Sequence, residues 1–380
     1  MSPKKWSFLG VFITALVVLA GCQQPPAAPG NLTITGPESG VPNEHYSFVA
    51  AVDPLTTTVP LTYQWEVTGA TPISSTSGLT HTAEFTWDKP GLYDVTVTAS
   101  NAAGKTSKSY KFLVAMPLSA DSTEAAQTIF KQQNQAKTSH IDLNLNLNLK
   151  LNGLKTQDAQ SAQTLALFKN FKANATVSGD VDNVKNEFHL QGELDLGALT
   201  PFIANGEDTL KFEVIMVGNK IYSKTANDTT WNVQDAPDTK SGSTATSVLG
   251  PELLASLLQD TIKADKLSDE TIDGVDTYHY KVTLDMAKLI DAANDLSSAT
   301  GGSPLDPQTI TEAKKLFANS LFEVDLWAGK LDLLNRQAKA HFNLNLDNIP
   351  DQPGATALID LTLDSKASKI NEPVTITAPK

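Results

Sequence analysis

Cysteine is almost absent from this chain, whose 380 residues include only Cys22. A single cysteine excludes an intrachain disulfide and a thiolate metal site, so each domain must be stable through its own apolar core. Long apolar runs are equally scarce, and the clearest one covers residues 8–20. At roughly 13 residues it is shorter than the roughly 20 that a spanning helix needs. Because no comparable run follows, we expect no later segment to cross a membrane.

The motifs of common catalytic sites are missing as well. The sequence contains no G-x-S-x-G, P-loop, G-x-G-x-x-G or H-E-x-x-H pattern. Its six histidines are scattered without metal-ligand spacing. His279 lies between two tyrosines on an alternating segment, and we expect it on the wetter face of a strand. Residues 269–274 resemble a calcium loop only loosely, and a hairpin turn is the expected structure there. Asp180, Asp182 and Asn183 beside Gly179 likewise predict a turn. We therefore predict no enzymatic activity, no metal and no cofactor.

Basic residues are outnumbered, with 29 lysines and arginines against 42 aspartates and glutamates, for a net charge of −13. Such an acidic surface argues against a nucleic-acid partner and against broad electrostatic binding to anionic lipid headgroups. The length and the otherwise ordinary composition indicate two or three globular domains.

The N-terminus has the layout of an export signal. Lys4 and Lys5 precede the apolar run, and Leu19-Ala20-Gly21-Cys22 spans its end. This tetrad resembles the bacterial lipobox. The resemblance implies a signal peptide over residues 1–21, acylation of the Cys22 thiol and a mature protein that begins at Cys22, anchored by lipid to the extracytoplasmic face of the cell membrane or of an outer membrane. The alternative is a plain signal peptide or an uncleaved anchor.

Residues 22–30 are rich in proline and alanine and predict a semi-extended tether. Residues 31–115 then show short alternating segments separated by turn residues, the pattern of a small β-sandwich. The segments at 61–66 and 89–101, with Trp65 and Tyr93, resemble a polycystic kidney disease (PKD) or related immunoglobulin-like module. Both aromatic residues are expected in its core. Such modules usually serve as spacers or adhesive units.

Residues 120–380 predict a second, larger domain that opens on a helix capped by Ser122. Its strongest signal is residues 141–151, where leucine or isoleucine alternates with polar residues. This period of two predicts a long strand with one apolar face. Similar segments recur along the domain, the last at 374–377, and predict roughly ten strands, which we expect to form one large antiparallel sheet. Candidate helices to cover its apolar face lie at 122–137, 251–263, 286–296 and 307–321.

The segments 217–224, 272–280, 322–327 and 371–376, with Trp231 and Arg336, resemble the succession of motifs in the LolA and LppX/LprG superfamily of lipoproteins and lipoprotein carriers. The resemblance implies a mainly β fold with some α, a large curved antiparallel sheet or unclosed β-barrel covered by helices, and a cavity that holds acyl chains of a lipid ligand. The expected lining residues are Leu145, Leu147, Phe188, Phe212 and Phe342.

These residues fit a filled core equally well. The chain is therefore expected to be a membrane-anchored lipoprotein that binds, transfers or displays a lipid or lipidated molecule, with a further protein partner in the cell envelope left open. The alternative is a surface interaction protein with a filled core and exposed loops such as residues 235–247.

Overall fold

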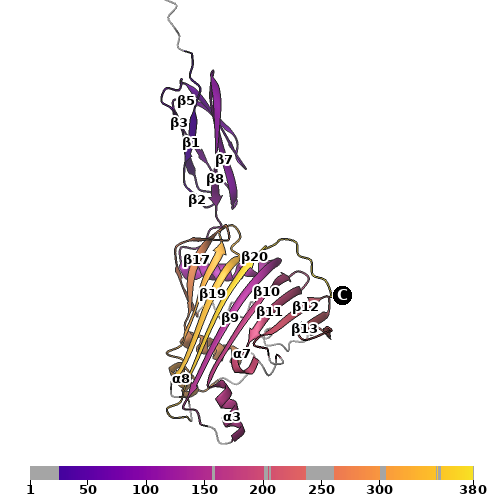
Figure 1. The fold of residues 1–380 in the computed structure, drawn as a ribbon. Helices are drawn as coiled ribbons and strands as arrows, with labels where there is room; N and C mark the ends of the chain where they lie inside the picture. Colours follow the sequence, from indigo (N-terminus) through magenta and orange to yellow (C-terminus); the bar gives the residue numbers. More distant parts are fainter. Residues whose placement is uncertain are drawn as a thin grey trace, which may run out of the picture. The chain divides into compact units, whose positions relative to one another are not determined.

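The computed structural model describes residues 25–155, 159–200, 204, 207–236, 261–299, 305–347, 349 and 352–379. The chain divides into two compact units, Met1–Pro117 and Leu118–Lys380. Figure 1 shows both units and labels many of their helices and strands.

The N-terminal unit is a β-sandwich of two sheets. One sheet has the order β1-β3-β6, with bounds Asn31–Thr35, Tyr46–Asp53 and Thr80–Phe85, and the other has the order β2-β8-β7-β4-β5, with bounds Ser39–Gly40, Gly104–Val114, Gly91–Asn101, Leu61–Val67 and Ile73–Ser77. On β4 every second residue is buried. This alternation places one face of the strand in the core. The immunoglobulin-like architecture predicted for this unit is confirmed.

Aromatic side chains fill the space between the two sheets. The Trp65 side chain is 0% exposed, and its indole N–H donates to Nδ1 of His81 at 3.0 Å. The ring of Phe48 on β3 lies 5.4 Å from that of Phe112 on β8. Tyr93 is half-buried and packs against Trp87. The expected core role is therefore confirmed for Trp65, whereas Tyr93 lies at the margin of the core.

Hydrogen bonds hold the tether to this unit from Ala27 onward. The Ala27 N–H donates to Oγ1 of Thr58, and its carbonyl accepts from the Thr58 N–H and the Asn101 side chain. The free spacer expected over residues 22–30 is thus shorter than predicted, because only residues 23–26 separate Cys22 from this attachment.

The C-terminal unit is built on one 12-stranded sheet. Its order is β14-β13-β12-β11-β10-β9-β20-β19-β18-β17-β15, and β16 also pairs with β17. The paired strands in it are antiparallel, and β14 and β15 form its two ends. The predicted large, unclosed antiparallel sheet is therefore confirmed. The bounds are β9 Thr138–Asn152, β10 Asn170–Asp182, β11 Glu187–Asp195, β12 Leu210–Val217, β13 Lys220–Thr225, β14 Asn232–Asp235, β15 Ile262–Lys266, β16 Glu270–Ile272, β17 Val275–Leu284, β18 Leu321–Gly329, β19 Asn335–Asp347 and β20 Thr356–Ser368.

The leucine-rich segment forms β9 at the middle of the sheet, where it pairs with β10 on one side and β20 on the other. Leu147 lies opposite Ala173 and Leu361. Residues that face each other in a ladder share one side of the sheet. We call the side that carries Leu143, Leu145, Leu147, Leu149 and Leu151 the apolar face, and the opposite side the polar face.

Helix α2 (Ser122–Gln132) packs against β15 and β17 through Ala125, Ala126 and Ile129, which are buried. Its N-cap is Asp121, which accepts from the Glu124 N–H, rather than the predicted Ser122. Asp121 occupies the N-cap position because its carboxylate accepts a hydrogen bond from an N–H of the first turn that has no partner within the helix.

The other described α-helices are α3 (Ala159–Phe168), α7 (Met286–Ala299) and α8 (Pro307–Leu316). Two sequence predictions fail here. The helix expected over 251–263 cannot include its last residues, because β15 begins at Ile262, and residues 251–260 lie outside the described residues. Residues 374–377 form no strand. Cover of the whole apolar face by helices stays a prediction.

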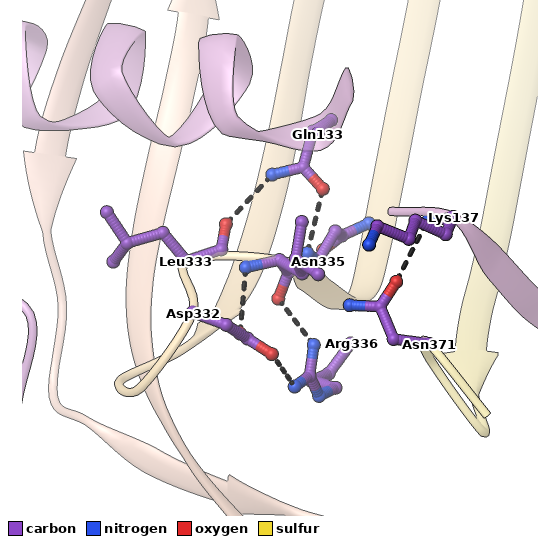
Figure 2. Close-up of polar contacts among 8 residues, drawn as sticks. Gln133, Lys137, Asp332, Leu333, Asn335, Arg336 and Asn371 are labelled. Atoms are coloured by element: carbon purple, nitrogen blue, oxygen red, sulfur yellow. Dashed lines mark hydrogen bonds and ion pairs between the residues drawn. The ribbon is translucent and has the colours of Figure 1, made fainter. Parts of the chain in front are cut away.

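The C-terminal end of α2 is attached to the turn between β18 and β19 (Figure 2). The Gln133 amide donates to the Leu333 carbonyl at 2.9 Å and accepts from the Asn335 N–H at 2.8 Å. Arg336 supports the same turn, donating to the Leu334 carbonyl at 2.9 Å and to the Asp332 carboxylate at 2.6 Å. One glutamine therefore joins the helix to two backbone groups that lie 200 residues further along the chain.

Candidate functional site

The five residues predicted to line a cavity all lie on the apolar face. Leu145 and Leu147 are on β9, and Phe342 on β19 lies opposite Leu361, the partner of Leu147. Phe188 lies opposite Val181, and Phe212 opposite Gly192. Their ladders connect to β9 on the same side. The structure thus brings the five residues onto one continuous surface, and their role as ligand contacts stays a prediction.

This surface is incompletely buried. Leu143, Leu145, Leu147, Leu149 and Leu151 are each half-buried, as are Phe188, Phe212 and Phe342. The core of the N-terminal unit is different, since Phe48, Tyr63 and Trp65 are all 0% exposed. A row of large apolar side chains that keeps partial contact with solvent is a feature of ligand-binding surfaces.

Small residues widen the space on one side of β9. Ala173 and Ala175 on β10 lie opposite Leu147 and Leu145, and Gly192 follows on β11. A Cβ atom on Gly192 would stand 2.8 Å from the ring of Phe212 and would clash with the Thr176 carbonyl oxygen. Glycine therefore allows the Phe212 ring to lie close to the backbone of β11.

A cavity of about 260 Å³ lies on the apolar face below the end of α2. Apolar side chains from three segments line it, namely Ile141 with Leu143, Leu334, and Ala367 with Ile370, beside polar residues such as Ser139 and Ser365. Gln133, the residue that attaches α2 to the β18–β19 turn, also lines it. The cavity is therefore bordered by the beginning of the leucine row, two residues before Leu145.

The polar face carries every histidine of the C-terminal unit, each beside a carboxylate on a neighbouring strand. The pairs are His140 with Asp180 at 2.7 Å, His189 with Glu213 at 2.7 Å, His279 with Asp325 at 3.1 Å and His341 with Asp360 at 2.7 Å. Burial of Glu213 would raise its pKa, but hydrogen bonds from His189 and Lys224 outweigh it and lower the pKa. The alternation of the strands thus separates charge from the leucine face.

A hollow of about 470 Å³ crosses the polar side of β9 to β13. Two rows of polar side chains border it, one including Ser178, Gln191 and Glu213 and the other Thr176, Glu193 and Lys211. Neighbouring residues on a strand point to opposite sides of the sheet. Val177 and Phe212 lie between the two polar rows, so they contribute backbone atoms to the bottom of the hollow, while their side chains are on the apolar face. Sequence reasoning missed this hollow, because the pairing of five strands was not predicted.

His279 lies on the polar face, as predicted, but it is only 7% exposed. Its ring stacks on Trp327 at 4.1 Å, and its two nitrogens face Glu270 at 3.2 Å and Asp325 at 3.1 Å. Residues 270–277 form the expected hairpin, since β16 and β17 flank Asp273 and Gly274, both with positive φ. Two such residues between paired strands are typical of a tight hairpin turn.

Asp269 instead belongs to a charged group at the edge of the apolar face. It forms ion pairs with Lys266 at 3.4 Å and Lys330 at 3.0 Å, and both ammonium groups lie over the ring of Tyr278. Burial, with a smaller contribution from Asp269, raises the pKa of Tyr278 to about 12. The phenol is therefore neutral at physiological pH. Sequence reasoning had no signal for this group, whose members come from three separate segments.

The remaining predictions concern metals and the membrane. Within the described part of the chain, no group of three or more histidine, cysteine, aspartate and glutamate side chains is arranged to hold a metal ion. None of the described helices is both long and apolar enough to cross a lipid bilayer. Cys22 and the signal sequence lie outside the described residues.

Residues 31–114 match the PKD domain family, which confirms the resemblance predicted for this unit. No curated protein matches the chain. One similar solved structure is the PKD domain of an M14-like peptidase from Thermoplasmatales archaeon SCGC AB-540-F20, which is 22% identical, with a TM-score of 0.21, over 23% of this chain and 97% of that chain.

Two further solved structures cover a larger share of the chain. A DUF1329 family protein from Desulfovibrio piger is 12% identical, with a TM-score of 0.18, over 67% of this chain and 96% of its own. A putative outer membrane lipoprotein-sorting protein domain from Vibrio parahaemolyticus is 10% identical, with a TM-score of 0.19, over 67% of this chain and 94% of its own. At these TM-scores neither likeness decides the fold or the function of this protein, and the predicted resemblance of residues 120–380 to the LolA and LppX/LprG superfamily stays a prediction.

Proposed function

We propose that this protein is a lipid-anchored extracytoplasmic lipoprotein that binds a lipid or a lipidated molecule against the apolar face of its C-terminal sheet. Cys22 carries the anchor, and the N-terminal PKD unit holds the binding unit near the membrane. The protein performs no chemistry on its ligand and takes no cofactor. The observation that carries the proposal is the row of half-buried leucines on β9, continued by Phe188, Phe212 and Phe342.

Energetics favours an apolar surface as the essential part of such a site. A lipid with two acyl chains has on the order of 30 methylene groups, and moving them from a bilayer into water costs roughly 25 kcal/mol at about 0.8 kcal/mol each. A dry apolar surface recovers most of this free energy without any polar residue at a fixed position. The absence of a catalytic motif is consistent with this task.

Separation of the two faces supports the same proposal. The ionisable side chains of β9, including His140, Asp142 and Lys150, are on the polar face, because they alternate with the leucines along the strand. An acyl chain on the leucine side therefore meets no charged group along β9. Charged groups at the sheet edge, such as Lys266 and Lys330, remain available to a polar headgroup only by giving up their pairing with Asp269.

Native mass spectrometry tests the proposal. The soluble chain beginning at Gln23 is purified from a lipid-containing bacterial host and measured before and after organic extraction. We expect a bound mass of lipid size that extraction removes and added lipid restores. A bare protein mass that no lipid mixture shifts would contradict lipid binding and favour a surface interaction protein whose function resides in its loops.

A pair of variants ties the bound mass to the apolar face. Leu147→Trp enlarges a side chain on that face, and Asn146→Trp makes the matched change one residue earlier, on the polar face. We expect Leu147→Trp to reduce the lipid-bound fraction and Asn146→Trp to leave it unchanged. Circular dichroism checks that both variants are folded. Equal loss of lipid in the two would place the ligand elsewhere.

A further inference from the structure

The N-terminal unit carries an exposed apolar loop between β3 and β4. Leu55 is 82% exposed and Val59 is 49% exposed. The Thr57 N–H and hydroxyl both donate to the Pro54 carbonyl, closing a tight turn with Leu55 and Thr56 at its tip. Residues 54–60, Pro-Leu-Thr-Thr-Thr-Val-Pro, include no charged side chain. A single exposed leucine is common on protein surfaces. This one is notable because its loop is hydrogen-bonded to the segment that follows Cys22, the predicted site of the lipid anchor.

The same loop holds the segment that follows the anchor. Thr58 exchanges two hydrogen bonds with Ala27, at 2.8 Å through its hydroxyl and at 3.1 Å through its N–H. The Asn101 side chain donates to the carbonyls of both Ala27 and Thr58. Three hydrogen bonds therefore fix Ala27 against this loop at Thr58, next to Val59 in the sequence.

Covalent reach then limits how far this loop lies from the membrane. Five residue steps separate Cys22 from Ala27. A fully extended chain spans at most about 3.6 Å per residue, so the two Cα atoms are at most about 18 Å apart in any conformation. If Cys22 carries the lipid, Ala27 and the loop beside it must lie close to the headgroup layer.

We propose that the tip of the loop, Leu55 with Val59, inserts into the headgroup and acyl boundary of the anchoring membrane and so orients the PKD unit on the bilayer. This inference rests on the acylation of Cys22 in the proposed function. The occupant is the bilayer because the short connection leaves the loop next to it. One leucine is too little to bind a free protein to a membrane, but the anchor makes the contact intramolecular.

The lone cysteine allows a clean test. Acylation consumes the Cys22 thiol, so Thr56→Cys places the only free thiol of the mature lipoprotein next to Leu55. The acylated full chain is labelled there with a polarity-sensitive fluorophore and reconstituted into phosphatidylcholine vesicles. The control is Asp88→Cys, which follows β6 at the other end of the same sandwich. Emission wavelength and quenching by aqueous iodide are measured for both.

We expect the label at residue 56 to emit at shorter wavelength and to be quenched several-fold less than the label at residue 88. Adding Leu55→Ser to Thr56→Cys should restore most of the quenching, and the soluble chain that begins at Gln23 should show no protection. Equal quenching at both positions in a protein whose intact mass includes the acyl chains would overturn the membrane contact and leave the lipoprotein proposal standing. An intact mass without acyl chains would overturn both.

Discussion

At the scale of single residues, Gly192 shows how the apolar face depends on the smallest side chain. We expect Gly192→Ala to lower the free energy of unfolding by about 1–3 kcal/mol, the usual cost of overpacking. The reason is that the added Cβ meets the Thr176 carbonyl oxygen and the Phe212 ring. The ring can rotate away, but the carbonyl belongs to the backbone of β10 and can shift only by distorting the sheet. Urea unfolding measures the change.

The matched control for this substitution is Gln191→Ala, one residue earlier on the opposite side of β11, where the side chain is exposed. A surface change of this kind should stay within about 0.5 kcal/mol. If Gly192→Ala were no worse than Gln191→Ala, the Phe212 ring would have another place to pack.

Asp182 is a buried carboxylate at the end of β10 whose charge is held by the turn that follows. The N–H groups of Val184 and Lys185 donate to it, both at 3.0 Å, and the Lys185 ammonium lies 3.2 Å away. The hydrogen bond from the Lys185 backbone N–H is the main cause that lowers the pKa of Asp182, and burial of the carboxylate opposes it.

A lowered pKa in the folded state fixes the sign of the pH effect. Between the folded and the unfolded pKa values the unfolded chain binds more protons, so this contribution to stability is complete above about pH 4 and is lost as the pH falls through the lower, folded value. We expect Asp182→Asn to be less stable at neutral pH and to lose part of the acid dependence of unfolding. Asp235→Asn, an exposed residue on β14, is the control. If the free energy of unfolding depended on pH in the same way in Asp182→Asn and in the unsubstituted protein, this role of Asp182 would be contradicted.

At the scale of elements, the attachment of α2 provides a prediction about the cavity below it. Gln133→Ala removes the partners of the Leu333 carbonyl and the Asn335 N–H. Leaving two such groups without hydrogen bonds costs about 1–3 kcal/mol each when they stay dry. We expect lower stability together with weaker lipid retention, since Gln133 lines the cavity of about 260 Å³.

Chemical denaturation and native mass spectrometry measure these two effects. Lys131→Ala serves as the control because Lys131 is exposed on the same helix. Loss of stability without any loss of lipid would show that the ligand does not use the cavity below α2.

The elements also show what could be predicted from the sequence. Strand β9 was predicted because leucine or isoleucine alternates with polar residues over 141–151, and the pairings of the structure place Leu145, Leu147, Phe188, Phe212 and Phe342 on one face. Strand β10 was not predicted, although Phe171, Ala173, Ala175 and Val177 alternate within it. Gly179, Asp180, Asp182 and Asn183 indicated a turn; a turn does begin at Asn183, but the first three residues lie on the strand itself. Pairing with β9 and β11 overrides their local preference.

The position of the cavity and of the polar hollow could not be predicted, because both depend on pairings between distant segments. The partner of β9 on one side is β20, some 200 residues later in the chain, and the cavity also needs Leu334 from the turn between β18 and β19 and Ile370 from just after the end of β20. A period of two identifies the face of a strand but not its neighbour.

At the scale of the whole molecule, the two units differ in how completely their apolar residues are buried. The N-terminal sandwich contains a continuous core of fully buried aromatic and aliphatic side chains. The leucine row of the C-terminal sheet is half-buried. We expect the soluble chain to unfold in two calorimetric transitions, because multidomain chains commonly depart from two-state behaviour.

Lipid should act on only one of these transitions. A ligand that binds the folded C-terminal unit stabilises that unit alone, by about 2.7 kcal/mol when its free concentration is a hundred times Kd. For a unit of this size such a gain raises Tm by roughly 5–10 °C. Scanning calorimetry of the lipid-loaded and lipid-depleted chain measures both transitions, and the transition of the PKD unit is the internal control. An equal rise in both would mean that lipid acts on the whole chain or its solvent, and the half-buried leucine face would then need a protein partner to cover it.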